Sequence, residues 1–180
     1  SGRPIGTDIV SAPMQVFLTG ASSGLGAALA RRYAGEGATL GLVARREGEL
    51  SRLAASLAPA TVATYACDVR DSDALAQAGA DFIARFGCPD VVIANAGISR
   101  GFLTELPEDL PAMRAIFETN VYGIVHTFQP FVAAMAQRRA GVLAGIASVA
   151  GFRGMPGSGA YCGSKSAAIT GIRSSASICL

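Results

Sequence analysis

The sequence contains few residues that could bind a metal or form a cross-link. His126 is the single histidine, and the four cysteines, Cys67, Cys88, Cys162 and Cys179, lie far apart without a Cys-x-x-Cys pair. We therefore expect neither a metal site nor a disulfide scaffold. The cysteines are interpreted as reduced thiols, which favours the cytoplasm.

Charged residues and long apolar runs are also scarce. Charged residues make up 16% of the chain, the formal net charge is +2, and no basic run is longer than Arg45-Arg46 or Arg138-Arg139. Such a charge distribution argues against a nucleic-acid partner. No apolar run approaches the roughly 20 residues that span a bilayer, so we also expect no membrane partner.

The chain is long enough for one domain with a substantial core, because 51% of its 180 residues are hydrophobic. Residues 1–13 are rich in Gly, Pro, Ser and Thr and precede Met14. We interpret them as a leader or flexible arm, which leaves residues 14–180 as the folded domain.

From Met14 onward, short apolar runs alternate with Ala-rich amphipathic stretches. The apolar runs are typical of strands buried on both faces, and the Ala-rich stretches are typical of helices. This alternation predicts an α/β Rossmann-type fold, a doubly wound parallel sheet with helices on both faces. The predicted strands are Gln15 to Thr19, Thr39 to Val43, Thr61 to Cys67, Val91 to Ala94 and Gly141 to Ala147. The predicted helices are Leu25 to Glu36, Glu47 to Leu57, Ser72 to Phe86 and Met113 to Arg138.

A glycine-rich turn joins the first predicted strand to the first predicted helix. Glycines at this place let backbone N–H groups approach a pyrophosphate without a Cβ in the way. The turn therefore favours a dinucleotide site, although the same glycines would also suit a tight strand-to-helix connection. It consists of Thr19, Gly20, Ala21, Ser22, Ser23, Gly24, Leu25 and Gly26.

The end of the second strand favours NADP(H) over NAD(H). An acidic residue there would bind the adenosine ribose and repel a 2′-phosphate, whereas this chain has Ala44 followed by Arg45. The Arg45 guanidinium suits a phosphate, and Arg46 or the Ser22 hydroxyl could assist it. The alternative is that Arg45 and Arg46 are a solvated pair at a helix start.

Two further strand ends carry candidate cofactor contacts. Asp68 could accept a hydrogen bond from an adenine amino group, and Gly97 could let a cofactor approach the backbone. In the alternative interpretation, Asp68 caps the helix that starts near Asp71, and Asn95 ties two strand ends together. The candidates are Asp68 and Val69 at the third strand and Asn95, Ala96 and Gly97 at the fourth.

The candidate catalytic residues lie late in the chain. Tyr161 and Lys165 are four residues apart, so they share one face of a helix. An ammonium about 4 Å from a phenol stabilises its ionised form by about 4 kcal/mol at an effective dielectric near 20, so Tyr161 could act near neutral pH. Ser148 could donate to the same substrate oxygen, and Asn120 could disturb its helix enough to hold a water that links Lys165 to solvent. Taken alone, the Tyr-x-x-x-Lys spacing is also common on exposed helices.

Together these motifs resemble the compact single-domain branch of the short-chain dehydrogenase/reductase family. The glycine turn matches its TGxxxGxG motif, residues 95–97 match its NAG motif, and four residues match its catalytic tetrad: Asn120, Ser148, Tyr161 and Lys165. The resemblance implies that Tyr161 is the proton donor or acceptor and that Ser148 orients the carbonyl. It also implies that Lys165 holds the nicotinamide ribose and that Asn120 serves a proton relay.

The chain departs from the family pattern at its carboxyl end. Family members continue past the Tyr-Lys helix, whereas this chain stops at Leu180, and Gly171 to Leu180 is rich in Ser with a weak helical pattern. We expect a truncated domain that lacks its last strands, with an exposed strand edge and a tendency to form dimers or tetramers.

Two functions remain open from the sequence. One is an NADP(H)-dependent oxidoreductase that acts on a small carbonyl or alcohol substrate, with an uncharged ketone or aldehyde weakly favoured. The other is a catalytically silent cofactor-binding fragment or assembly module.

Overall fold

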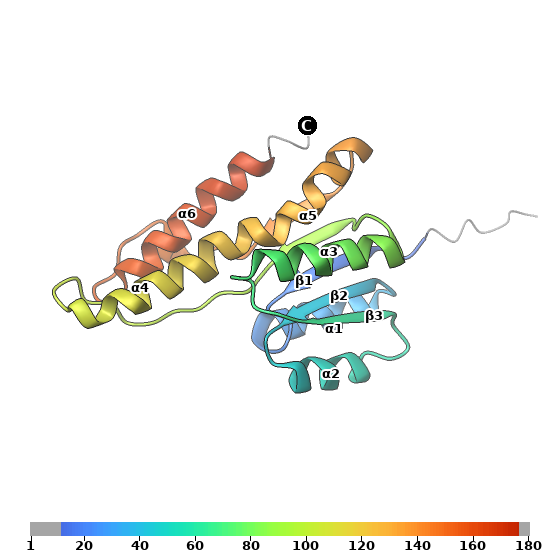
Figure 1. Ribbon diagram of the computed structural model, residues 1–180, viewed down its shortest axis with the longest axis horizontal. Helices are drawn as coiled ribbons and strands as arrows, with labels where there is room; N and C mark the ends of the chain where they lie inside the picture. The colour runs from blue at the N-terminus through green and yellow to red at the C-terminus, as the bar shows by residue number, and fades with distance from the viewer. Residues whose placement is uncertain (1–11, 177–180) are drawn as a thin grey trace, which may run out of the picture.

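The computed structural model describes residues 12–176, so most of the predicted leader and the last four residues lie outside the described part. Within the described residues the structure has five strands and six α-helices, which alternate except that two helices follow one another between the fourth and fifth strands (Figure 1). The strands are β1 (Gln15–Thr19), β2 (Thr39–Ala44), β3 (Val62–Ala66), β4 (Val91–Ala94) and β5 (Val142–Gly145). The helices are α1 (Gly24–Gly35), α2 (Glu47–Ser56), α3 (Ser72–Phe86), α4 (Leu110–Phe117), α5 (Gly123–Arg138) and α6 (Gly159–Ala176).

The strands form one parallel sheet in the order β3-β2-β1-β4-β5. The predicted fold class is therefore confirmed. The chain winds outward from β1 to β3 and then returns to place β4 on the other side of β1. In such sheets a crevice opens at the carboxyl ends of the strands where the order reverses, here between β1 and β4.

Helices cover both faces of the sheet and bury two apolar cores (Figure 1). On one face α1 and α2 pack against alternate residues of β1 and β2, with Leu18 and Leu42 fully buried between them. On the other face α3 and α5 bury Phe17, whose ring lies 4.7 Å from that of Phe131 and 5.5 Å from that of Phe82. Because side chains alternate between two covered faces, β1 is apolar from Val16 to Leu18 and β2 has no polar side chain from Leu40 to Ala44.

The predicted long helix differs from the observed one at its start and in its middle. It begins at Leu110 as α4, passes through a π-helical turn at Glu118–Tyr122, and continues as α5. The third and fifth strands are each shorter than predicted, and β5 extends only as far as its neighbour β4 allows. Each residue of β5 pairs with one of the four residues of β4. Within residues 12–176, no helix has the length and apolar character required to cross a membrane.

Candidate functional site

A cleft of about 260 Å³ lies at the carboxyl ends of β1 to β4. Most of the residues predicted to bind a cofactor line it, and the second, third and fourth strand ends all contribute. Its predicted lining residues are Gly20, Ser22, Ser23, Arg45, Arg46, Asp68, Val69, Asn95, Ala96 and Gly97, and Ala44, Cys67, Ile98 and Thr119 complete it.

The glycines of the β1–α1 turn allow the turn to pack against the end of β4. Gly20 has a φ of +67°, and a Cβ there would lie 2.8 Å from the Cα of Ala96. A Cβ on Gly26 would lie 2.6 Å from Asn95 Nδ2 and would also overlap the Gly20 carbonyl oxygen. Gly24 and Leu25, at the start of α1, are exposed. The tight connection considered from the sequence is therefore one role of this turn.

Asn95 ties the ends of β1 and β4 together. Its Nδ2 donates to the carbonyl oxygens of Thr19 and Gly20, both at 3.1 Å. In return, the Thr19 hydroxyl oxygen accepts hydrogen bonds from the backbone N of Asn95 at 3.3 Å and from the backbone N of Ala96 at 3.4 Å. These bonds fix one wall of the cleft. Asn95 therefore ties two strand ends together, which was the alternative interpretation of this residue from the sequence.

The basic wall of the cleft carries two guanidinium groups. Arg46 donates to the Ser22 hydroxyl at 3.4 Å and pairs with Glu49 at 2.8 Å. The Arg45 side chain is 65% exposed and lies 3.7 Å from the Asp68 carboxylate across the cleft. Two positive groups beside the N-terminus of α1, where Ser23 provides no side-chain cap, form a site that suits a phosphate.

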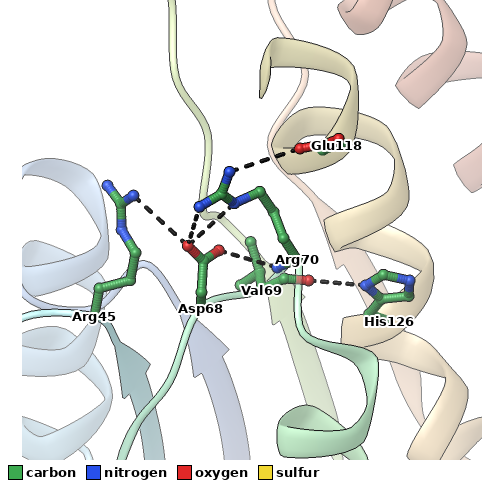
Figure 2. A network of polar contacts seen from close by, with 6 residues as sticks. All are labelled: Arg45, Asp68, Val69, Arg70, Glu118 and His126. Atoms are coloured by element: carbon green, nitrogen blue, oxygen red, sulfur yellow. Dashed lines mark hydrogen bonds and ion pairs between the residues drawn. The ribbon is translucent and has the colours of Figure 1, made fainter. Parts of the chain in front are cut away.

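Asp68 lies at the centre of a polar network at the end of β3 (Figure 2). Its Oδ2 accepts from the Arg70 Nε at 3.1 Å and Nη2 at 2.9 Å, and its Oδ1 accepts from the Arg70 backbone N at 3.0 Å. Burial opposes ionisation of Asp68, but the hydrogen bonds from Arg70 and the charges of Arg70 and Arg45 together hold its pKa below the usual value. Asp71, and not Asp68, caps α3, because its Oδ1 accepts from Asp73 N and Ala74 N.

Asn120 occupies the middle of the π-helical turn and is fully buried. Its Oδ1 accepts from Ile98 N at 2.8 Å, while its Nδ2 donates to Ile98 O at 2.9 Å and to the Ser164 hydroxyl at 3.0 Å. Asn120 therefore joins the loop after β4 to α6. The helix is disturbed around Asn120, as predicted, and the amide is used in direct contacts to Ile98 and Ser164.

Lys165 lies on α6 one turn after Tyr161, with its side chain almost completely buried. Its Nζ donates to the Ile146 carbonyl oxygen at 2.7 Å and lies 5.8 Å from the centroid of the Tyr161 ring. Burial lowers the pKa of the Lys165 ammonium below its ordinary value. The Ile146 contact anchors this charge at the end of β5.

Ser148 follows β5 and precedes a short 3-10 turn at Val149–Gly151, where its hydroxyl oxygen accepts from Ala150 N at 3.2 Å. That turn packs directly on α6, since a Cβ on Gly151 would lie 2.9 Å from the backbone carbonyl of Lys165. Gly97 links this region to the cleft. A Cβ there would lie 3.3 Å from Asn120 Oδ1 and 3.6 Å from Lys165 Nζ, so the glycine leaves space directly above both groups.

Three side chains have structural roles at the site that were not predicted from the sequence, although Thr19 was named there as part of the glycine-rich turn. Thr19 braces Asn95, Ser164 connects Asn120 to the Tyr161 carbonyl oxygen, and Arg70 holds Asp68. The contact between Arg70 and Asp68 could have been predicted from the sequence, because a guanidinium two residues from a carboxylate can reach it. Ser164 stands beside Lys165 in the sequence, but its partner is 44 residues away.

The comparisons with known proteins agree with this geometry. The model of the short chain dehydrogenase family matches residues 14–177. This chain belongs to the short-chain dehydrogenase family. An uncharacterized oxidoreductase of Mycobacterium tuberculosis is 36% identical over 165 residues, which are 89% of this chain and 63% of that protein. The dehydrogenase/reductase SDR family member 7B of Bos taurus is 37% identical over 161 residues, which are 84% of this chain and 49% of that protein.

Solved structures of dehydrogenases have the same fold. An alcohol dehydrogenase from Thermococcus sibiricus, complexed with 5-hydroxy-NADP, superposes with a TM-score of 0.84 at 29% identity, over 91% of this chain and 70% of that one. A short chain dehydrogenase/reductase from Burkholderia phymatum in complex with NAD gives 0.81 at 31% identity, over 88% of this chain and 57% of that one. This chain spans about half to two thirds of the length of the two curated relatives described above.

Proposed function

We propose that this chain is the cofactor-binding and catalytic part of an NADP(H)-dependent oxidoreductase that interconverts a carbonyl compound and an alcohol. The observation that carries the proposal is the continuity of two groups of residues at Gly97. Gly97 lines the cleft that could hold a dinucleotide, and a Cβ on this glycine would lie 3.3 Å from Asn120 Oδ1 and 3.6 Å from Lys165 Nζ.

The residues of the cleft fit a phosphorylated dinucleotide. Arg45 and Arg46 would meet the 2′-phosphate, and Ser22, Ser23 and the N-terminus of α1 would meet the pyrophosphate. Asp68 and Val69 would border the adenine, and residues 95–97 would border the nicotinamide ribose. Both NADP and NAD accompany structurally similar family members, so the preference for NADP(H) rests on Arg45 and on the absence of an acidic residue at position 44.

The catalytic residues act on the proton that accompanies hydride transfer, and the nicotinamide, when bound, supplies the hydride. Tyr161 would donate a proton to the carbonyl oxygen, or accept it from an alcohol. Lys165 would place its buried ammonium beside that phenol, since Nζ lies 5.8 Å from the centroid of the Tyr161 ring. Ser148 would hydrogen-bond the same substrate oxygen, and Asn120 would hold the loop at Ile98 and α6 in register.

The alternative is a cofactor-binding chain without turnover. It is favoured by exposed apolar side chains next to Ser148, since Val149 is 85% exposed and Phe152 is 73% exposed. These side chains would border the substrate of a short-chain dehydrogenase.

A groove between α5 and α6 is also apolar and supports a homodimer or tetramer.

A fluorescence titration with NADPH and NADH tests the proposal. We expect micromolar NADPH binding and much weaker NADH binding, and Arg45→Asp should abolish the preference for NADPH because it replaces a cation by an anion at the phosphate. Binding of neither nucleotide would contradict the proposed cofactor site. Turnover is then measured against a panel of uncharged ketones and aldehydes, and nucleotide binding without turnover of any of them would favour the alternative.

A further inference from the structure

The Asp68 carboxylate creates an electrostatic conflict at the proposed phosphate end of the cleft. Asp68 and Arg45 both line the cleft, and the two side chains lie 3.7 Å apart. A 2′-phosphomonoester carries up to two negative charges near neutral pH and would compete with Asp68 for the same guanidinium. An ionised carboxylate at that distance would also repel the phosphate.

Arg70 is placed to remove this conflict. It contributes three donors to Asp68, two from its guanidinium and one from its backbone, and both carboxylate oxygens are engaged (Figure 2). The Arg45 contact is longer, and its side chain is more exposed than that of Arg70. Two shorter guanidinium contacts with favourable geometry dominate one long contact, so Arg70 is the main counter-charge of Asp68.

Arg70 also makes a second, longer ion pair. Its Nη1 lies 3.6 Å from Glu118 Oε2 at the start of the π-helical turn. The preceding residue is also anchored, because His126 Nδ1 donates to the Val69 carbonyl oxygen at 2.9 Å. A Cβ on Gly123 would lie 2.8 Å from Val69 Cγ2, so this segment packs closely on the helix that follows Asn120. Arg70 therefore approaches Asp68 from a braced backbone.

We propose that Arg70 is a specificity-determining positioning residue, which neutralises Asp68 and so leaves Arg45 available for the 2′-phosphate of NADP(H). This inference rests on the proposed cofactor preference. Two arginines would then determine the preference between the two cofactors. Arg45 contacts the phosphate, and Arg70 acts through Asp68 without touching the phosphate. Without Arg70, Asp68 would retain Arg45 as its counter-charge and would add a negative charge beside the phosphate.

The test compares the ratio of the NADH and NADPH dissociation constants in the whole chain and in its Arg70→Met variant. We expect the preference for NADPH to fall by about fivefold or more, because the competition acts on the phosphate and not on the ribose hydroxyl. Arg70→Lys keeps the charge but loses the two-point contact, and it should give an intermediate ratio. Circular dichroism and thermal melts would verify that each variant is folded.

A double variant separates this electrostatic role from a structural one. Adding Asp68→Asn to Arg70→Met removes the charge that would retain Arg45, so the preference for NADPH should return toward the wild-type value. Glu118→Gln is the matched control, because it removes the second ion pair of Arg70 and leaves the Asp68 contacts in place. It should change the ratio by less than about twofold.

The outcomes distinguish the two proposals. A wild-type chain that binds both nucleotides equally, or binds neither, would overturn the cofactor preference and this inference with it. A wild-type preference for NADPH that survives Arg70→Met would overturn the role of Arg70 alone. So would an equal loss of affinity for both nucleotides, a double variant that does not recover, or a Glu118→Gln variant that shifts the ratio as strongly as Arg70→Met.

Discussion

The inner strands β1 and β2 and the edge strand β5 differ in how completely they are buried. In β1 and β2 every residue after the first is buried, whereas no residue of β5 is buried. The large apolar side chains that remain exposed follow the same division. Met14 and Leu25 belong to the N-terminal part, and the others belong to the C-terminal part: Leu103, Leu110, Tyr122, Val125, Val142, Val149, Phe152 and Met155.

This difference separates the two tasks of the proposed enzyme. The proposed dinucleotide cleft is built from β1 to β4, where both faces of the sheet are covered by helices. The candidate catalytic residues depend on β5, α6 and the turn after Ser148, where apolar surface remains exposed. We therefore expect nucleotide binding to be more robust in this chain than substrate turnover.

The largest effect is expected from Tyr161→Phe, which tests the catalytic half alone. Removing the hydroxyl should lower turnover of any carbonyl substrate by about 100-fold or more, because a general acid typically contributes that much. The nucleotide dissociation constant should stay nearly unchanged. Tyr33→Phe, in α1 and away from the site, is the control and should leave turnover intact. Unchanged turnover in Tyr161→Phe would rule out the proposed proton donor.

A substitution at Gly26 tests the cofactor half. Gly26→Ala would force a Cβ against the Gly20 carbonyl and Asn95 Nδ2, so we expect loss of nucleotide binding and destabilisation by about 1–3 kcal/mol. Gly35→Ala lies in the same helix with open space around its Cα and should be neutral or slightly stabilising. Isothermal titration and urea denaturation measure both effects. Equal behaviour of the two variants would contradict the packing role of Gly26.

A matched pair of strand substitutions compares the burial of the inner strand β2 and of the edge strand β5 directly. Leu42→Ala removes a fully buried side chain of β2 and should lower the free energy of unfolding by about 2–5 kcal/mol. Val142→Ala removes a side chain of β5 that is 54% exposed and should cost less than about 1 kcal/mol. Chemical denaturation gives both values. A large loss in Val142→Ala would mean that β5 is covered in solution, for example by a second copy of the chain.

The smallest effect is a pH-dependent difference at Lys165. Because burial lowers the pKa of this ammonium in the folded state, the folded chain binds fewer protons than the unfolded chain between the lowered pKa and 10.5. Wild-type stability should therefore rise relative to that of Lys165→Met as the pH increases through this interval. Urea denaturation of both proteins from neutral to alkaline pH measures the difference. A constant difference would show that Lys165 is not destabilised by burial.

Much of the fold was predictable from the sequence, because its signals are local. Apolar runs, Ala-rich stretches and a glycine turn each act over a few residues, and they correctly predicted the parallel sheet and gave its strand ends to within about two residues. The same local patterns placed most cofactor candidates in one cleft, since the carboxyl ends of parallel strands meet at one edge. The roles assigned to these residues stay predictions.

The sequence was less informative where residues have distant partners. Asp68 had two interpretations, and only the structure revealed that Asp71 caps the helix while Arg70 binds the carboxylate. Likewise the position of Asn120 was predicted, but its contacts with Ile98 and Ser164 were not. A hydrogen-bond partner far along the chain leaves no periodic pattern to recognise.

By itself, the sequence determined the order of strands and helices, the family and the type of chemistry its motifs suggest. Only the tertiary structure decided which charges neutralise one another in the cleft, how the π-helical turn places Asn120 beside α6, and which apolar surfaces remain exposed. The physical reason is that periodicity and turn chemistry depend on neighbours along the chain. Burial and charge pairing depend on neighbours in space, which the chain acquires only when β1 to β5 assemble.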